Sequence, residues 1–130
     1  MASPGTKSIR VVLAGRPKLV SVLNDALRAP GIRVVACCTD RAQTLAALER
    51  GAADVCIVDR QLAGGGLIAA AAVASPRAAP KVLVIGDRDA PAEQRAATLA
   101  GAAAYLPSST DAAALVAAVS RLANHPRTRR

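Results

Sequence analysis

The sequence predicts an α/β fold in which five parallel strands form one sheet that helices cover on both faces. Short runs rich in Val, Ile and Leu alternate strictly with segments whose apolar residues have helical spacing. The apolar runs are nearly continuous, which is the pattern of strands buried on both faces. Right-handed crossovers then give a three-layer (βα)5 sandwich, for which the flavodoxin-like strand order 2-1-3-4-5 is the natural arrangement.

The strands must build an aliphatic core, because the chain has no Phe or Trp and only one Tyr. Alanine-rich helices can pack close to such a sheet, but each buries little area. The predicted strands are 8–14, 32–38, 54–59, 81–86 and 103–107.

Capping signals place the predicted helices between these strands. The first predicted helix presents an apolar face from Leu19 to Leu27, and the second, 41–50, is capped by Thr39-Asp40 and ended by Gly51. The third is 67–74, and the fourth begins at Pro91 and closes at Gly101. The last helix is capped by Thr110-Asp111 and has on one face Leu115, Val116, Val119 and Leu122.

The chain of 130 residues is long enough for one domain, which we expect over 8–123, with flexible tails at 1–7 and 124–130. The first residues lack the apolar core of a signal peptide, and no apolar run is long enough to predict a membrane span. We therefore expect a cytoplasmic protein that does not contact a membrane.

The net charge of +8 suggests an anionic partner such as nucleic acid. The basic residues are scattered along the sequence, however, and none of the predicted helices is a basic recognition helix. A solvated basic surface is therefore favoured over a nucleic-acid face. Contact with DNA would then need a separate helix-turn-helix domain.

Cysteine and histidine usage excludes several kinds of site. Cys37, Cys38 and Cys56 are odd in number and lack C-x-x-C spacing, which argues against a disulfide framework or a zinc site. We expect them to be small buried hydrophobes in a reducing compartment. The only histidine, His125, lies in the predicted tail. The sequence therefore argues against Ser-His-Asp and Cys-His catalytic sites and against multi-histidine metal sites.

Ligands of such folds bind at the carboxyl ends of the strands. Asp59 ends the apolar run "VCIV" there, where a carboxylate is a candidate nucleophile or ligand; the alternative is an ordinary loop aspartate. Arg16 follows the first strand, and Asp87 follows the fourth as a second carboxylate or an exposed loop charge. The glycines at 64–66 could cradle a phosphate, but a flexible loop is the better interpretation.

From Ile9 to Ala123 the chain resembles the receiver domain of two-component response regulators, a CheY-like fold, and most closely the NarL/LuxR type. The segments that carry the resemblance are "IRVVLAGRPKLV", "RAPGIRVV", "DVCIVDRQLAGGGL", "KVLVIG" and "AGAAAYLPSS". The resemblance implies a cytoplasmic signalling domain of a phosphorelay and a role in transcription regulation, without enzymatic activity.

The resemblance assigns Asp59 to the phosphoacceptor position. The family's acidic pair, which holds Mg²⁺, matches Gly15 and Arg16. The hydroxyl residue after the fourth strand matches Gly86, and the lysine after the fifth strand matches Ser108. We therefore expect a degenerate pseudo-receiver without a cofactor, in which Mg²⁺ binding is weak or absent.

The switch aromatic of the family matches Tyr105, for which a plain packing role is slightly favoured. Arg16 is a candidate counter-charge for Asp59 in place of the metal; the alternative is that Arg16 points into water. The resemblance further implies a protein partner, either a homodimer through about 91–123 or an output domain. Two alternatives remain: a conventional phosphoacceptor at Asp59, and a flavodoxin-like domain that binds a small anionic ligand at Gly15-Arg16 and the triple glycine.

Overall fold

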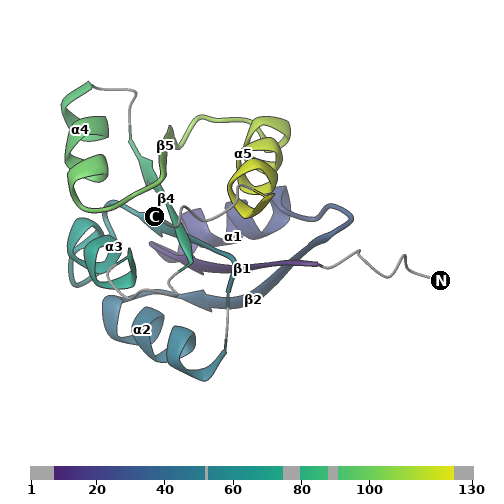
Figure 1. Cartoon of the computed structure of the whole chain (residues 1–130), viewed down its shortest axis with the longest axis horizontal. Coiled ribbons are helices and arrows are strands. Elements are labelled where there is room, and N and C mark those ends of the chain that lie inside the picture. The colour runs from purple at the N-terminus through teal and green to yellow at the C-terminus, as the bar shows by residue number, and fades with distance from the viewer. Residues whose placement is uncertain (1–7, 52, 75–79, 88–90, 125–130) are drawn as a thin grey trace, which may run out of the picture.

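The computed structural model describes residues 8–51, 53–74, 80–87 and 91–124 (Figure 1). The predicted tail 1–7 and residues 125–130 lie outside this part of the chain, whereas Asn124 ends the last helix. In chain order the elements are β1 (Ile9–Ala14), α1 (Pro17–Ala26), β2 (Ile32–Cys38), α2 (Arg41–Arg50), β3 (Val55–Asp59), α3 (Gly66–Ala74), β4 (Lys81–Gly86), α4 (Pro91–Leu99), β5 (Ala104–Pro107) and α5 (Ala112–Asn124).

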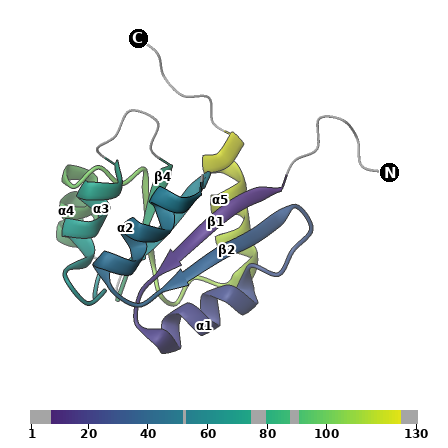
Figure 2. The same ribbon diagram turned by 90° about the horizontal axis from the view of Figure 1, so that it is seen from below.

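The sheet confirms the predicted fold class. Its strand order is β2-β1-β3-β4-β5, and every neighbouring pair is parallel. Helices α1 and α5 cover one face, and α2, α3 and α4 cover the other (Figures 1 and 2). The carboxyl ends of β1, β3 and β4 consequently meet at one edge of the sheet, which is where the predicted site residues lie.

Each face of the sheet has its own aliphatic core. The large side chains that are almost fully buried come from the three central strands, except for Leu27 and Val119. The helices over the α2–α4 face contribute mainly alanine, as at Ala69, Ala70 and Ala97. The sheet therefore supplies most of the apolar area that folding removes from water.

The helix boundaries agree with the predicted capping residues. The Asp40 carboxylate accepts from the N–H of Gln43 at 2.7 Å, and the Asp111 carboxylate accepts from Ala114 at 2.8 Å. Pro91 is the first residue of α4, and Gly101 follows that helix with a φ of 104°, a left-handed conformation that favours glycine. No helix in the described part of the chain is long and apolar enough to span a bilayer.

Two of the three cysteines are buried, and the prediction that Cys37 is buried is wrong. Cys38 and Cys56 are buried, whereas Cys37 is exposed. Successive residues of a strand point to opposite faces, so Cys37 points away from the core that Cys38 enters. Because β2 is the edge strand, that opposite side is open to solvent there.

The register between β1 and β2 shifts by one residue in mid-strand. Val11 pairs with Val34, but Val12 pairs with Ala36, so Val35 has no partner in β1. An unpaired residue of this kind is a β-bulge, which twists the strand locally. Val35 is 42% exposed beside the bulge.

Candidate functional site

Asp59 is a buried carboxylate at the carboxyl end of β3, with an exposed fraction of only 1%. Gly15 makes room for it, since a Cβ at position 15 would lie 2.5 Å from the Cβ of Asp59. Real Cβ atoms essentially never approach that closely. Gly15 is thus the residue against which Asp59 packs.

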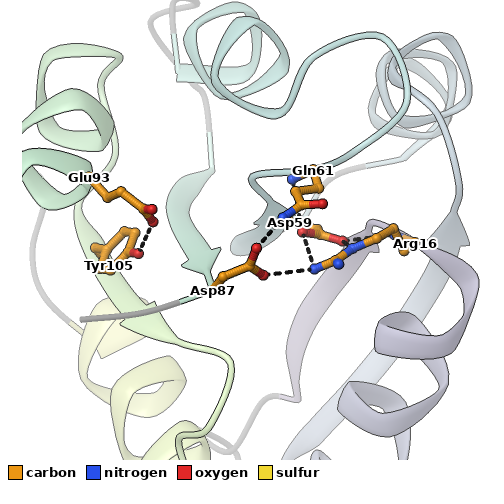
Figure 3. Close-up of polar contacts among 6 residues, drawn as sticks. All are labelled: Arg16, Asp59, Gln61, Asp87, Glu93 and Tyr105. Carbon is orange, nitrogen blue, oxygen red and sulfur yellow. Dashed lines mark hydrogen bonds and ion pairs between the residues drawn. The ribbon is translucent and has the colours of Figure 1, made fainter. Parts of the chain in front are cut away.

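Arg16 binds both oxygens of this carboxylate (Figure 3). Its Nε donates to Asp59 Oδ2 at 2.8 Å, and its Nη2 donates to Oδ1 at 3.2 Å. The backbone N–H of Arg16 donates to Oδ2 as well, at 2.9 Å. The break between β1 and α1 sets this geometry, because Pro17 begins α1 and leaves Arg16 in extended conformation just before it.

Two further residues extend the contact. The backbone N–H of Gln61 donates to Asp59 Oδ1 at 2.9 Å. Nη2 of Arg16 also donates to Oδ1 of Asp87 at 3.3 Å, and the Gln61 side-chain amide donates to the other oxygen of Asp87 (Figure 3). One guanidinium therefore bridges the carboxylates that follow β3 and β4.

This arrangement favours the ionised form of Asp59. Burial alone would raise the pKa of Asp59, but the hydrogen bonds from Arg16 and Gln61 outweigh it and hold the pKa below its ordinary value. The hydrogen bond to Asp59 in turn raises the pKa of Arg16. The two directions agree: each partner stabilises the charge of the other.

The residues present do not fit a magnesium ion. Mg²⁺ prefers octahedral oxygen coordination and is usually held by one or two carboxylates with waters. In the described part of the chain, the carboxylates at the ends of β3 and β4 are Asp59 and Asp87, and both already contact the permanent cation of Arg16. Over the described ranges, no group of three or more His, Cys, Asp and Glu side chains could hold a metal.

Tyr105 points toward β4 and donates its phenol hydrogen to Oε1 of Glu93 at 2.6 Å (Figure 3). Burial and the Glu93 carboxylate raise the pKa of Tyr105 to about 12. Gly86 makes this position possible, because a Cβ there would lie 2.5 Å from Cζ of the ring and closer still to its oxygen. The phenol thus fills space that a side chain at position 86 would need.

The remaining predicted residues lie outside this polar network. Ser108 is exposed, and its N–H donates to the carbonyl of Gly86 at 2.7 Å. In the triple glycine, the carbonyl of Gly64 accepts from Nη1 of Arg41 at 2.7 Å, and the N–H of Gly65 donates to the carbonyl of Leu62. An anion is bound by backbone N–H groups, and that of Gly65 is already engaged within the protein.

Sequence reasoning missed two partners in this region. Gln61 binds Asp59 through its backbone N–H, which any residue type would supply, and its side-chain amide reaches Asp87 only because the fold brings the loops after β3 and β4 together. Glu93 stands two residues after Pro91, where an acidic residue is expected merely from the helix dipole. Only the spacing of twelve residues between Glu93 and Tyr105, read together with the fold, could have indicated the pair.

Comparison with known proteins gives similarity to solved structures alone; no family model and no curated protein matches the chain. The receiver domain of the response regulator NarL from Mycobacterium tuberculosis is 29% identical, with a TM-score of 0.85 over 92% of this chain and 99% of that one. A LuxR-family response regulator from Aurantimonas sp. SI85-9A1 is 26% identical, with a TM-score of 0.80 over 90% of this chain and 86% of that one.

The response regulator ChrA of a heme-sensing two-component system is 31% identical, with a TM-score of 0.74 over 89% of this chain but only 57% of that one. These three solved structures are thus a NarL receiver domain, a LuxR-family response regulator and a further response regulator. The CheY-like receiver fold is the fold of this chain.

Proposed function

We propose that residues 8–123 form an atypical receiver domain of a two-component or phosphorelay-type transcriptional response regulator. It signals through protein–protein contacts and independently of Mg²⁺-dependent aspartyl phosphorylation, without being an enzyme. One observation carries the proposal: the Arg16 guanidinium binds both oxygens of the Asp59 carboxylate.

Phosphorylation of an aspartate needs a free carboxylate oxygen and a cation that screens the transferring phosphoryl group. Each oxygen of Asp59 already accepts two hydrogen bonds. Oδ2 accepts from Nε and the backbone N–H of Arg16, and Oδ1 accepts from Nη2 of Arg16 and the backbone N–H of Gln61. An incoming phosphoryl group would have to displace donors of which one on each oxygen is a backbone N–H that cannot swing away as a side chain can. The position of the metal would also face the positive charge of Arg16.

The contact surface of this receiver is proposed to lie over about 91–123, either for a second copy of the chain or for an output domain. Leu99, at the end of α4, is 87% exposed, an unusual position for a large apolar side chain. A partner that covers Leu99 would remove its apolar surface from water, which stabilises association by roughly 25 cal/mol per Å². DNA contact belongs in this proposal to a separate helix-turn-helix domain.

The test is an NMR titration with Mg²⁺, followed by beryllofluoride as a phosphoryl mimic. We expect the amides of Asp59 and its neighbours to show no saturable shift up to millimolar Mg²⁺, and no change at Tyr105. A matched Arg16→Ala variant removes the competing cation and should show stronger Mg²⁺-dependent shifts than the wild type. Saturating shifts in the wild type that reach Tyr105 would instead support a conventional phosphoacceptor at Asp59.

The anionic-ligand alternative at Gly15-Arg16 has less support. A ligand there would compete with two carboxylates for one guanidinium, at an edge where Asp59 is buried and ionised. A thermal-shift screen with small phosphorylated and carboxylated metabolites tests it. A saturable stabilisation that disappears in Arg16→Ala would favour this alternative.

A further inference from the structure

Three arginines that are far apart in the sequence come together near the amino ends of β1 and β2, at the end of the sheet opposite to Asp59. Arg10 of β1 and Arg33 of β2 are register partners on neighbouring strands. Arg50 is the last residue of α2, the helix that lies along β1 and β2 (Figure 2). All three line one cavity of about 350 Å³, together with Val35, Ala36 and Ala47.

These arginines have no ionic partner among the described residues. The ion pairs in that part of the chain join Arg16 to Asp59, Arg16 to Asp87 and Arg28 to Asp25. The carboxylate of Asp54 contacts Arg10 only through the backbone, since its Oδ2 accepts from the N–H of Arg10 at 2.8 Å. Asp54 lines a neighbouring cavity that shares Arg10 and Arg33 with this one.

Uncompensated positive charge of this kind in a concave site attracts anions. The carboxyl end of α2 carries a partial negative charge, but it is equivalent to about half a unit and so does not cancel three guanidinium groups. Guanidinium groups match the geometry of phosphate oxygens and bind them through paired hydrogen bonds. A phosphate dianion is therefore the ligand group that the charges favour.

The rest of the cavity suits an apolar body attached to that phosphate. Val35, Ala36 and Ala47 offer only aliphatic surface, and the bulge at Val35 keeps its side chain partly exposed beside the arginines. The volume falls at the small end of the range for ligand pockets, about 300–1,000 Å³. A ligand of roughly mononucleotide size or smaller fits that volume.

We propose that this cavity is a binding site for a small phosphate ester, with Arg10, Arg33 and Arg50 holding the phosphate and the aliphatic wall contacting its apolar part. The site is separate from Asp59, which lies at the other end of the strands. The cavity is local and concave, whereas a nucleic-acid backbone would need basic residues spread along an extended surface. The proposal does not depend on the signalling role proposed above.

The experiment titrates the full chain with phenyl phosphate at constant ionic strength and follows the backbone amides of Arg33, Val35 and Ala47. We expect saturable shifts there, and weaker shifts with inorganic phosphate, which lacks the apolar part. Loss of one charged hydrogen-bonding partner corresponds to roughly tenfold weaker binding or more. We therefore expect that loss for Arg33→Gln and for Arg50→Gln.

Arg95→Gln is the matched control, because it removes the same charge from α4, outside the cavity. It should leave the affinity within about twofold. The proposal fails if phenyl phosphate causes no saturable shift at the cavity, or if Arg95→Gln weakens binding as much as Arg33→Gln. It also fails if a single-stranded oligonucleotide binds more tightly than phenyl phosphate and shifts amides near arginines all over the surface. Both cavity variants alter exposed side chains, and the amide spectrum itself reports whether they remain folded.

Discussion

Replacing Gly86 by alanine should expel the phenol of Tyr105 from its place against β4. The new Cβ would lie 2.5 Å from Cζ of the ring, whereas ordinary contact begins at 3.4 Å. The phenol oxygen would be nearer still, so the ring must retreat by more than about 0.9 Å, since the backbone at the end of β4 is paired with β5 and cannot yield easily. The hydrogen bond of 2.6 Å to Glu93 cannot survive such a shift.

The half-buried position of Tyr105 limits the expected cost of this substitution, because the ring can rotate toward solvent. A lost hydrogen bond to a charged group costs about 1.5–3 kcal/mol, and residual crowding adds to it. Urea unfolding of Gly86→Ala should therefore show a loss of about 2–4 kcal/mol.

The titration of the phenol gives the more direct measurement. Tyr105 is the only aromatic residue of the chain, so the ultraviolet absorbance of tyrosinate reports on it alone. The pKa should fall from about 12 in the wild type toward the ordinary value of 10.0, because Glu93 and burial no longer oppose ionisation. Gly51→Ala is the control, since a Cβ there meets nothing within 4 Å. A Gly86→Ala protein that keeps the wild-type pKa would refute the reasoning.

Three further substitutions test the polar edge and the helix caps. Arg16→Ala leaves the buried carboxylate of Asp59 with fewer donors; because Arg16 is 43% exposed, we expect a loss of about 1–3 kcal/mol, below that of a fully buried pair. Since the pKa of Asp59 is lowered in the folded state, its contribution to stability is present above the unfolded value of 3.8 and is lost as the pH falls through the folded value. That acid-dependent loss should shrink in Arg16→Ala, as carboxyl NMR and acid unfolding can measure. Gly15→Asp adds a carboxylate beside Asp59 but crowds Asp59, so calorimetry should find no gain in Mg²⁺ binding and a lower melting temperature. Asp40→Ala removes the cap of α2 and should cost about 1 kcal/mol in urea unfolding, whereas Asp25→Ala, on the exposed surface, should cost less.

The fold could be predicted because its signals are local. Each aliphatic run is short, and α2 and α5 begin at their own capping residues, Asp40 and Asp111, so the order of elements follows from the chain itself. The proximity of Arg16 to Asp59 follows from the same topology, because residues after neighbouring parallel strands meet at one edge.

Contacts that depend on register or on empty space could not be predicted. Arg10, Arg33 and Arg50 look scattered in the sequence, and only the pairing of β1 with β2 and the end of α2 bring them together. Glu93 meets Tyr105 because Gly86 leaves room for the ring, a property of volume rather than of pattern. Cys37 is exposed because β2 lies at the edge of the sheet, which its apolar sequence does not reveal.

The large side chains of the core come mostly from the sheet and not from the helices, and this affects which elements can move. Large buried side chains come mainly from β1, β3 and β4, whereas the helices over one face pack with alanine. Local opening requires little free energy where few apolar contacts must be broken. Amide hydrogen exchange should therefore be slowest in these three strands and much faster in α3 and α4. The central strands then form a rigid sheet, and the outer helices can shift individually while the sheet keeps its shape.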